Sequence, residues 1–183
     1  MNTIAYEPLV WGHGPRLLEV FLEPTCPFSA RAYSKLFELL ADAGDENLTV
    51  KIWLHSQPWH LFSGVIVRAI IAASTLPDGK AKADRIMRVI FDKREDYEFE
   101  NHARGPNLDA TPMDILKRIE EHSGVNVATA FTTLGLDSEM KRHTKYARQN
   151  GIHVSPTFMV NGLIEPNLGS GDAVEKWKAD LGL

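Results

Sequence analysis

The sequence predicts an α/β fold in which a helical insertion interrupts a small mixed sheet. Three observations carry this prediction: residues 17–54 have the pattern strand, helix, strand; residues 57–151 have helical apolar spacing; and residues 157–181 return to strand, strand, helix. A chain of 183 residues corresponds to about one domain. We therefore expect a discontinuous sheet domain (residues 1–56 and 152–183) and an inserted helical subdomain (residues 57–151).

The first part of the chain predicts a βαβ unit. Residues 17–22 form an apolar run that is short enough for a buried strand. Pro27 is pre-organised for a first helical position, so Cys26 becomes the N-cap of a helix that Gly44 ends. Residues 48–54 alternate between apolar and polar side chains, as a strand does. Two strands joined by one helix are expected to be parallel, with a right-handed crossover.

The middle of the chain predicts several helices with short connections. Thr111 and Pro112 form a helix start, and Gly124 forms a helix end. Residues 94–109 are polar and charged, and we expect a loop or a frayed turn there. The predicted helices lie near residues 61–75, 79–94, 111–123, 126–134 and 137–150.

The end of the chain predicts a hairpin and a final helix. Asn161 and Gly162 separate the apolar runs 157–160 and 163–165, and this pair is typical of a type I′ hairpin turn. Residues 172–181 place apolar side chains on one face of a helix. A strand 157–160 that runs antiparallel to the earlier strands would begin at the edge where those strands end.

Composition excludes several classes of protein. The net charge is −4 and there is no basic stripe, so we expect no nucleic-acid partner. No apolar run is long enough to span a bilayer, so we expect no membrane association. The N-terminus lacks the pattern of a signal peptide, which predicts a cytoplasmic protein, or a periplasmic one if an export segment has been removed. Cys26 is the one cysteine of the sequence, which excludes an internal disulfide.

The predicted topology brings three separate segments to one edge of the sheet. The first strand leads to Cys26, the second leads to residues 55–60, and the antiparallel strand starts after Ser155 and Pro156. In the second segment the candidates for contact with the thiol are His55, Gln57, Trp59 and His60. The alternative for these residues is a packing loop that opens the next helix, with Trp59 in the core. No local ligand spacing supports a metal site, and we predict none.

Cys26 stands at a position that favours a reactive thiol. The free N–H groups at a helix N-terminus stabilise a thiolate, and the Ser29 hydroxyl is expected to donate a hydrogen bond to it. The nearby Glu23 carboxylate opposes the thiolate by charge repulsion. The alternative is a buried cysteine that packs as a small apolar residue.

Two segments of the sequence carry a resemblance to a known family. They are Val20-Phe21-Leu22-Glu23-Pro24-Thr25-Cys26-Pro27-Phe28-Ser29 and Val154-Ser155-Pro156-Thr157-Phe158. Together they resemble the DsbA-like branch of the thioredoxin-fold superfamily. The resemblance implies a thioredoxin-like fold (β-α-β … β-β-α) with an inserted helical domain, and a cis-proline at Pro156 beside the nucleophile Cys26. The candidate substrate-binding residues at this edge of the sheet are Pro27, Phe28, Ser155, Pro156, Trp59 and His60.

The sequence departs from this family at its second cysteine. The family oxidoreductases carry a CxxC motif, whereas this chain has a CxxS motif with Ser29 in the last position. A serine hydroxyl cannot resolve a mixed disulfide, so the redox-active thiol of Cys26 needs an external thiol such as glutathione. The same spacing is similar to that of monothiol glutaredoxins, although those have glycine where Pro27 stands, and their iron–sulfur role is not carried over.

The resulting hypothesis is a monothiol thiol–disulfide oxidoreductase with Cys26 and Ser29 as catalytic residues. Its expected partners are glutathione, as a co-substrate, and a disulfide-containing peptide or protein; no tightly bound cofactor is expected. One alternative is a kappa-like glutathione transferase or isomerase, a family with serine at the helix start, where this chain has Cys26. The other alternative is a non-catalytic binding module that keeps the fold and the groove.

Overall fold

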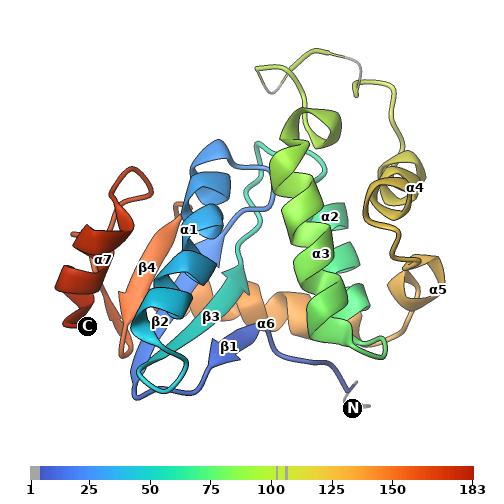
Figure 1. The fold of residues 1–183 in the computed structure, drawn as a ribbon. Coiled ribbons are helices and arrows are strands. Elements are labelled where there is room, and N and C mark those ends of the chain that lie inside the picture. The colour runs from blue at the N-terminus through green and yellow to red at the C-terminus, as the bar shows by residue number, and fades with distance from the viewer. Residues whose placement is uncertain (1–4, 102, 106) are drawn as a thin grey trace.

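A computed structural model describes residues 5–101, 103–105 and 107–183. Its centre is a five-stranded sheet with the strand order β1-β3-β2-β4-β5 (Figure 1). The strands are β1 (Val10–Gly12), β2 (Arg16–Leu22), β3 (Leu48–Leu54), β4 (Thr157–Val160) and β5 (Leu163–Ile164).

Strands β2 and β3 are parallel, and β4 runs antiparallel to β2, which confirms the predicted topology. The register pairs Leu22 with Leu54 at the carboxyl ends of the two parallel strands. Phe21, one residue earlier, pairs with Thr157 at the start of β4. The residues after β2, the residues after β3 and the residues before β4 therefore meet at one edge of the sheet.

The helices follow the predicted order with some changes in length. They are α1 (Pro27–Ala43), α2 (Ser63–Ser74), α3 (Gly79–Asp92), α4 (Pro112–Ser123), α5 (Ala128–Phe131), α6 (Leu136–Gln149) and α7 (Val174–Leu181), with a 3-10 turn η1 (Arg94–Tyr97). The helix predicted near 126–134 is wrong in extent, because only a single turn forms there. The turn η1 lies at the start of the segment 94–109, for which a loop or a frayed turn was predicted.

Local sequence signals end the elements where they were expected to. Cys26 is the N-cap of α1, Pro27 is its first residue, and Gly44 is its C-cap. Thr111 forms a capping box with Asp114 at the start of α4, with Asp114 N donating to Thr111 Oγ1 and Thr111 N donating to the Asp114 carboxylate. These confirmed predictions rest on contacts within three or four residues of the chain.

Strand β1 was missed by the sequence interpretation. Residues 10–12 pair antiparallel with the outer edge of β3, Val10 opposite Lys51 and Gly12 opposite Thr49. Gly12 has a φ of 73°, and a Cβ atom there would lie 2.1 Å from the Leu48 carbonyl oxygen. This close approach requires glycine, and it depends on a partner strand that is distant in sequence.

The two faces of the sheet are covered by different helices (Figure 1). On one face α1 and α7 lie against the sheet, and Trp177 of α7 contacts Phe158 of β4 with ring centroids 5.1 Å apart. On the other face Tyr146 of α6 packs on Phe21 and Trp53, with ring centroids 5.9 and 4.4 Å away. The proposed division of the chain at residues 151 and 152 stays a prediction, while α6 itself packs on the sheet.

The helices α2 to α5 form a second layer beside the sheet (Figure 1). Helix α2 lies at the centre of this layer and buries most of its residues, including Ile66, Ile70 and Ile71. Among the described residues, no helix combines the length and the apolar character that crossing a bilayer requires.

Candidate functional site

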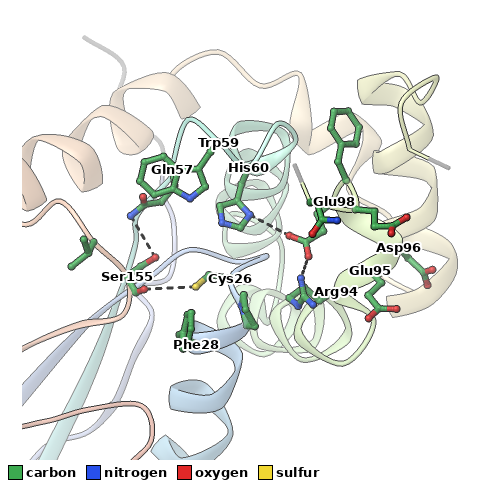
Figure 2. A pocket seen from close by; sticks show the side chains of 15 residues that line it. Cys26, Phe28, Gln57, Trp59, His60, Arg94, Glu95, Asp96, Glu98 and Ser155 are labelled. Carbon is green, nitrogen blue, oxygen red and sulfur yellow. Dashed lines mark hydrogen bonds and ion pairs between the residues drawn. The ribbon is translucent and has the colours of Figure 1, made fainter. Parts of the chain in front are cut away.

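A pocket of about 920 Å³ lies where the sheet edge meets the helical layer. Its lining comes from four parts of the chain: the start of α1, the loop after β3, residues 94–101, and the residues before β4 (Figure 2). The sequence analysis predicted three of these four segments. Pockets of this volume are large enough to hold a peptide-sized ligand.

Cys26 lies at the wall of this pocket. It is 7 % exposed, and its Sγ donates a hydrogen bond to the Ser155 carbonyl oxygen at 3.7 Å. As the N-cap of α1 it has an extended backbone, and no side chain caps the helix. The sulfur therefore lies between the free N–H groups of the first turn of the helix and the loop that precedes β4 (Figure 2).

The Ser155–Pro156 peptide bond is cis. Ser155 belongs to the pocket lining, and its hydroxyl accepts a long hydrogen bond from Gln57 Nε2 at 3.5 Å. Residues from the two ends of the predicted site, 57 and 155, are thus in direct contact beside the thiol.

Ser29 has a different contact from the one that was expected. Its side chain is fully buried, and its Oγ accepts a hydrogen bond from the Glu23 backbone N–H at 3.1 Å. Within the described residues no hydrogen bond joins it to Cys26. The reason is the path of the chain before α1. The turn at residues 23–26 brings the Glu23 backbone N–H over the first turn of the helix, where it donates to the Ser29 hydroxyl.

Glu23 is a buried carboxylate three residues before the thiol. Its Oε2 accepts hydrogen bonds from the Thr25 backbone N–H at 2.6 Å and from the Thr25 hydroxyl at 2.8 Å. Burial raises the pKa of Glu23 above its ordinary value, and the His60 imidazole and the Thr25 donors oppose this rise. The expected repulsion between Glu23 and a Cys26 thiolate is therefore weaker when this carboxyl is protonated.

His60 connects the cysteine motif with the helical layer. Its Nδ1 lies 2.9 Å from the Thr25 hydroxyl and 3.3 Å from Glu98 Oε2. The Thr25 hydroxyl has one hydrogen, which it donates to Glu23, so we assign His60 Nδ1 as the donor to Thr25 Oγ1, while Glu98 Oε2 lies at ion-pair distance. Glu98 also forms an ion pair with Arg94 (Figure 2).

Two aromatic side chains stand at the rim of the pocket. Phe28 is 51 % exposed and Trp59 is 52 % exposed, although both are large and apolar. Both line the pocket, as does Pro27. Exposed aromatic rings beside a cavity are typical of binding surfaces rather than of a packing loop.

His55 lies outside this arrangement. It is absent from the pocket lining, and burial lowers its pKa below the ordinary value, against a hydrogen bond with the His153 backbone. Among the described residues, no group of three or more His, Cys, Asp or Glu side chains is placed to hold a metal ion.

The sequence analysis missed Thr25, Arg94 and Glu98. Arg94 and Glu98 lie in the segment that was expected to be a polar loop, about 70 residues from Cys26 in the sequence. The run of acidic residues at 95, 96, 98 and 100 was a signal in this segment. It did not indicate contact with His60, because the helical layer must be assembled before the two approach each other.

Comparison with known proteins places these features in a family. No protein-family model and no curated protein sequence matches the chain. A solved structure from Pseudomonas syringae, provisionally described as a protein-disulfide isomerase, is 62 % identical. The alignment covers 96 % of this chain and 98 % of that one, with a TM-score of 0.95.

More distant structures share the fold. DsbA of Chlamydia trachomatis is 18 % identical, with a TM-score of 0.67 over 98 % of this chain and 94 % of that one. Oxidised BdbD of Bacillus subtilis is 17 % identical, with a TM-score of 0.67 over 96 % and 94 % of the two chains. The sequence identity with the Pseudomonas syringae protein is high enough to show that the two chains are homologous and do not merely share a fold. The chain belongs to the family of DsbA-like thioredoxin-fold oxidoreductases.

Proposed function

We propose that the protein is a monothiol thiol–disulfide oxidoreductase in which Cys26 is the nucleophile. The Cys26 thiolate attacks one sulfur of a substrate disulfide, a mixed disulfide forms, and the other sulfur leaves as a thiolate. An external thiolate then attacks the substrate sulfur of the mixed disulfide, and Cys26 is released as a thiolate. The substrate disulfide is reduced to one thiol plus a disulfide with the external thiol, and Cys26 is regenerated.

One observation carries this proposal. Cys26 caps the N-terminus of α1 at the wall of a 920 Å³ pocket, and it hydrogen-bonds the backbone that precedes Pro156. The helix N-terminus stabilises the thiolate that both steps require. Ser29 stands where a resolving cysteine would stand, and its hydroxyl already accepts the Glu23 N–H. Because a serine hydroxyl cannot attack the mixed disulfide, we assign its resolution to an external thiol.

Glutathione is our candidate for the external thiol. It is a tripeptide, and the volume beside Cys26 is adequate for a molecule of that size. The Ser155 backbone, Phe28 and Trp59 are the groups we expect to contact the substrate, because they surround the sulfur and belong to the pocket lining. In this proposal Ser29 acts as a positioning residue that holds the chain before the thiol.

The test is to mix the reduced protein with oxidised glutathione and to weigh it by mass spectrometry. We expect one glutathione per chain on Cys26 and its release by excess reduced glutathione. The matched variants are Cys26→Ser, which should form no adduct, and Ser29→Ala, which should still form it. If the folded protein forms no adduct with oxidised glutathione or with a neutral disulfide, the proposal is wrong and the protein is a non-catalytic binding module.

The transferase alternative has its own readout. A kappa-like enzyme would conjugate glutathione to an electrophile such as 1-chloro-2,4-dinitrobenzene, and that activity should survive in Cys26→Ala. We expect no conjugation by either protein. Conjugation that persists without the cysteine would overturn the thiol mechanism.

A further inference from the structure

One wall of the pocket beside Cys26 is strongly acidic. The segment 94–100 contributes one cation and four carboxylates to the lining, and Arg94 forms an ion pair with Glu98. Within the described part of the chain no ion pair forms on the carboxylates of Glu95, Asp96 and Glu100. These three side chains are exposed to solvent, and the nearby Arg118 guanidinium donates to the Asp96 carbonyl, so the wall carries a net negative charge.

This wall is held in place by buried groups. Asn107 is almost fully buried, and its Nδ2 donates to the Glu98 carbonyl at 2.6 Å and to the Glu95 carbonyl at 3.3 Å. Arg118 donates to Asn107 Oδ1 at 2.7 Å. The carboxylates are therefore presented on backbone that is anchored to α4, which carries Arg118.

A second, independent feature of the pocket is a buried amide oxygen, on Gln57, that can accept a hydrogen bond from a ligand. Gln57 is 2 % exposed and belongs to the lining at the Ser155 end. Its Nε2 donates to the His153 carbonyl at 3.3 Å, but its Oε1 has no hydrogen-bond partner. A buried amide oxygen without a donor is unfavourable, and a ligand that donates a hydrogen bond to it removes that cost.

The two aromatic rings at the rim of the pocket, Phe28 and Trp59, also favour a positively charged ligand. The Arg31 guanidinium already lies 5.0 Å from the centroid of the Phe28 ring, although Arg31 is not part of the lining. Trp59 lines the pocket with half of its surface exposed. A tryptophan face attracts an ammonium or guanidinium group through its negative quadrupole.

We propose that this pocket selects disulfide substrates that carry a positive charge close to the sulfur–sulfur bond, such as aminoalkyl disulfides or cysteine peptides flanked by lysine or arginine. The inference rests on the proposed function, because it concerns the substrate that Cys26 attacks. The acidic wall and the face of the Trp59 ring attract the cation, and Gln57 Oε1 accepts a hydrogen bond from the substrate.

The test compares three small disulfides that differ in charge: cystamine, which is cationic; bis(2-hydroxyethyl) disulfide, which is neutral; and 3,3′-dithiodipropionate, which is anionic. The rate of adduct formation at Cys26 is measured for each probe by mass spectrometry. It is divided by the rate at which the same disulfide reacts with N-acetylcysteine amide, a small neutral thiol, so that the intrinsic reactivity of the probe cancels. We expect a normalised preference for cystamine over the anionic probe on the order of tenfold at low salt, which decreases as salt is added.

Two variants with equal net charge show where the preference arises. The triple variant Glu95→Gln, Asp96→Asn, Glu100→Gln should reduce the preference several-fold. The control triple variant Glu38→Gln, Asp45→Asn, Glu175→Gln changes exposed acids outside the pocket lining and should retain it. Gln57→Met should slow the reactions with cystamine and with bis(2-hydroxyethyl) disulfide, whose ammonium and hydroxyl groups can donate to Oε1, and should change the reaction with 3,3′-dithiodipropionate less, because that ionised probe has no donor.

The outcomes separate this inference from the proposed function. Equal normalised rates for the three probes, or an equal effect of both triple variants, would overturn the charge selection while the thiol chemistry stands. No adduct with any probe, the neutral one included, would remove the proposed function and the inference with it. Lysine-flanked and glutamate-flanked peptide disulfides, compared in the same way, show whether the selection extends from small molecules to polypeptides.

Discussion

The buried carboxylate of Glu23 is expected to affect both the stability of the fold and the reactivity of the Cys26 thiol. Replacement by glutamine keeps the size of the side chain and removes the charge. The new amide oxygen can accept the two hydrogen bonds that Thr25 now donates to Oε2. The amide nitrogen takes the place of the buried Oε1, and it can donate to the Ser63 hydroxyl, which interacts with the Glu23 carboxyl. We therefore expect Glu23→Gln to stabilise the fold above neutral pH.

The magnitude follows from the burial of this group. Burial raises the pKa of Glu23 above its ordinary value of 4.5, with His60 as the largest opposing influence. The folded protein therefore binds more protons than the unfolded chain between these two pKa values, and its stability decreases as the pH rises through that interval. Each pH unit in the interval costs about 1.4 kcal/mol. The advantage of Glu23→Gln is therefore expected to reach about 1.4 kcal/mol for each unit by which burial raises the pKa of Glu23.

The assay is urea unfolding between pH 4 and pH 8, followed by tryptophan fluorescence. The advantage of Glu23→Gln should be absent near pH 4, grow above it and reach a plateau, whereas the exposed control Glu38→Gln should show no such trend. Alkylation of Cys26 at neutral pH should become several-fold faster in Glu23→Gln, because a negative charge near the thiolate is removed. A variant that becomes less stable than the unmodified protein as the pH rises would refute the reasoning.

Three further predictions follow from other parts of the structure. Ser29→Cys should form an internal disulfide with Cys26 after reaction with oxidised glutathione, and a stable glutathione adduct in mass spectrometry would contradict this. His143 Nδ1 accepts the Leu54 N–H at 2.9 Å, and burial lowers the pKa of His143, against its contact with Glu139. The folded state therefore binds fewer protons below the ordinary pKa of 6.5, so stability should decrease as the pH falls from there, and urea titrations of His143→Gln should show a flatter profile. Trp177→Ala removes a fully buried indole and should cost about 3–5 kcal/mol in urea unfolding, while Cys26 alkylation in the folded state stays unchanged.

A second acidic transition is expected from the Glu139 carboxyl on α6. Burial alone would raise its pKa, but hydrogen bonds from His143, Arg142 and Tyr6 lower the pKa of Glu139 to about 2. This group therefore contributes stability above its ordinary pKa of 4.5, and that contribution is lost as the pH falls towards 2. In acid unfolding, Glu139→Gln should remove the loss between these two pH values. It should deepen the loss that starts near 6.5, because the Glu139 carboxylate supports the charged form of His143.

Much of the site could be predicted because it depends on short-range signals. Pro27 and Gly44 mark the ends of α1, and Asn161 and Gly162, with φ values of 49° and 85°, form the turn between β4 and β5. Each of these residues acts through its own backbone preference, which a sequence displays directly. The βαβ order then implied that Cys26 and residue 57 lie at one edge of the sheet.

The contacts that set the electrostatics of the site could not be predicted in this way. His60 lies between the Thr25 hydroxyl and Glu98, and Ser29 bonds the Glu23 amide instead of the thiol. Hydrogen bonds are sensitive to a few tenths of an ångström and to direction, and sequence spacing does not define either for segments that meet only in space.

The sequence by itself determined which atom can react and how many thiols the reaction must take from solution. It did so because the position of Cys26 at a helix start and the serine at position 29 are properties of the local chain. The tertiary structure decided what surrounds that atom: a fully buried carboxylate, a histidine that reaches the helical layer, and an acidic wall from residues 94–100. Those features arise only after folding, because long-range packing places charges from distant segments within a few ångströms of one another.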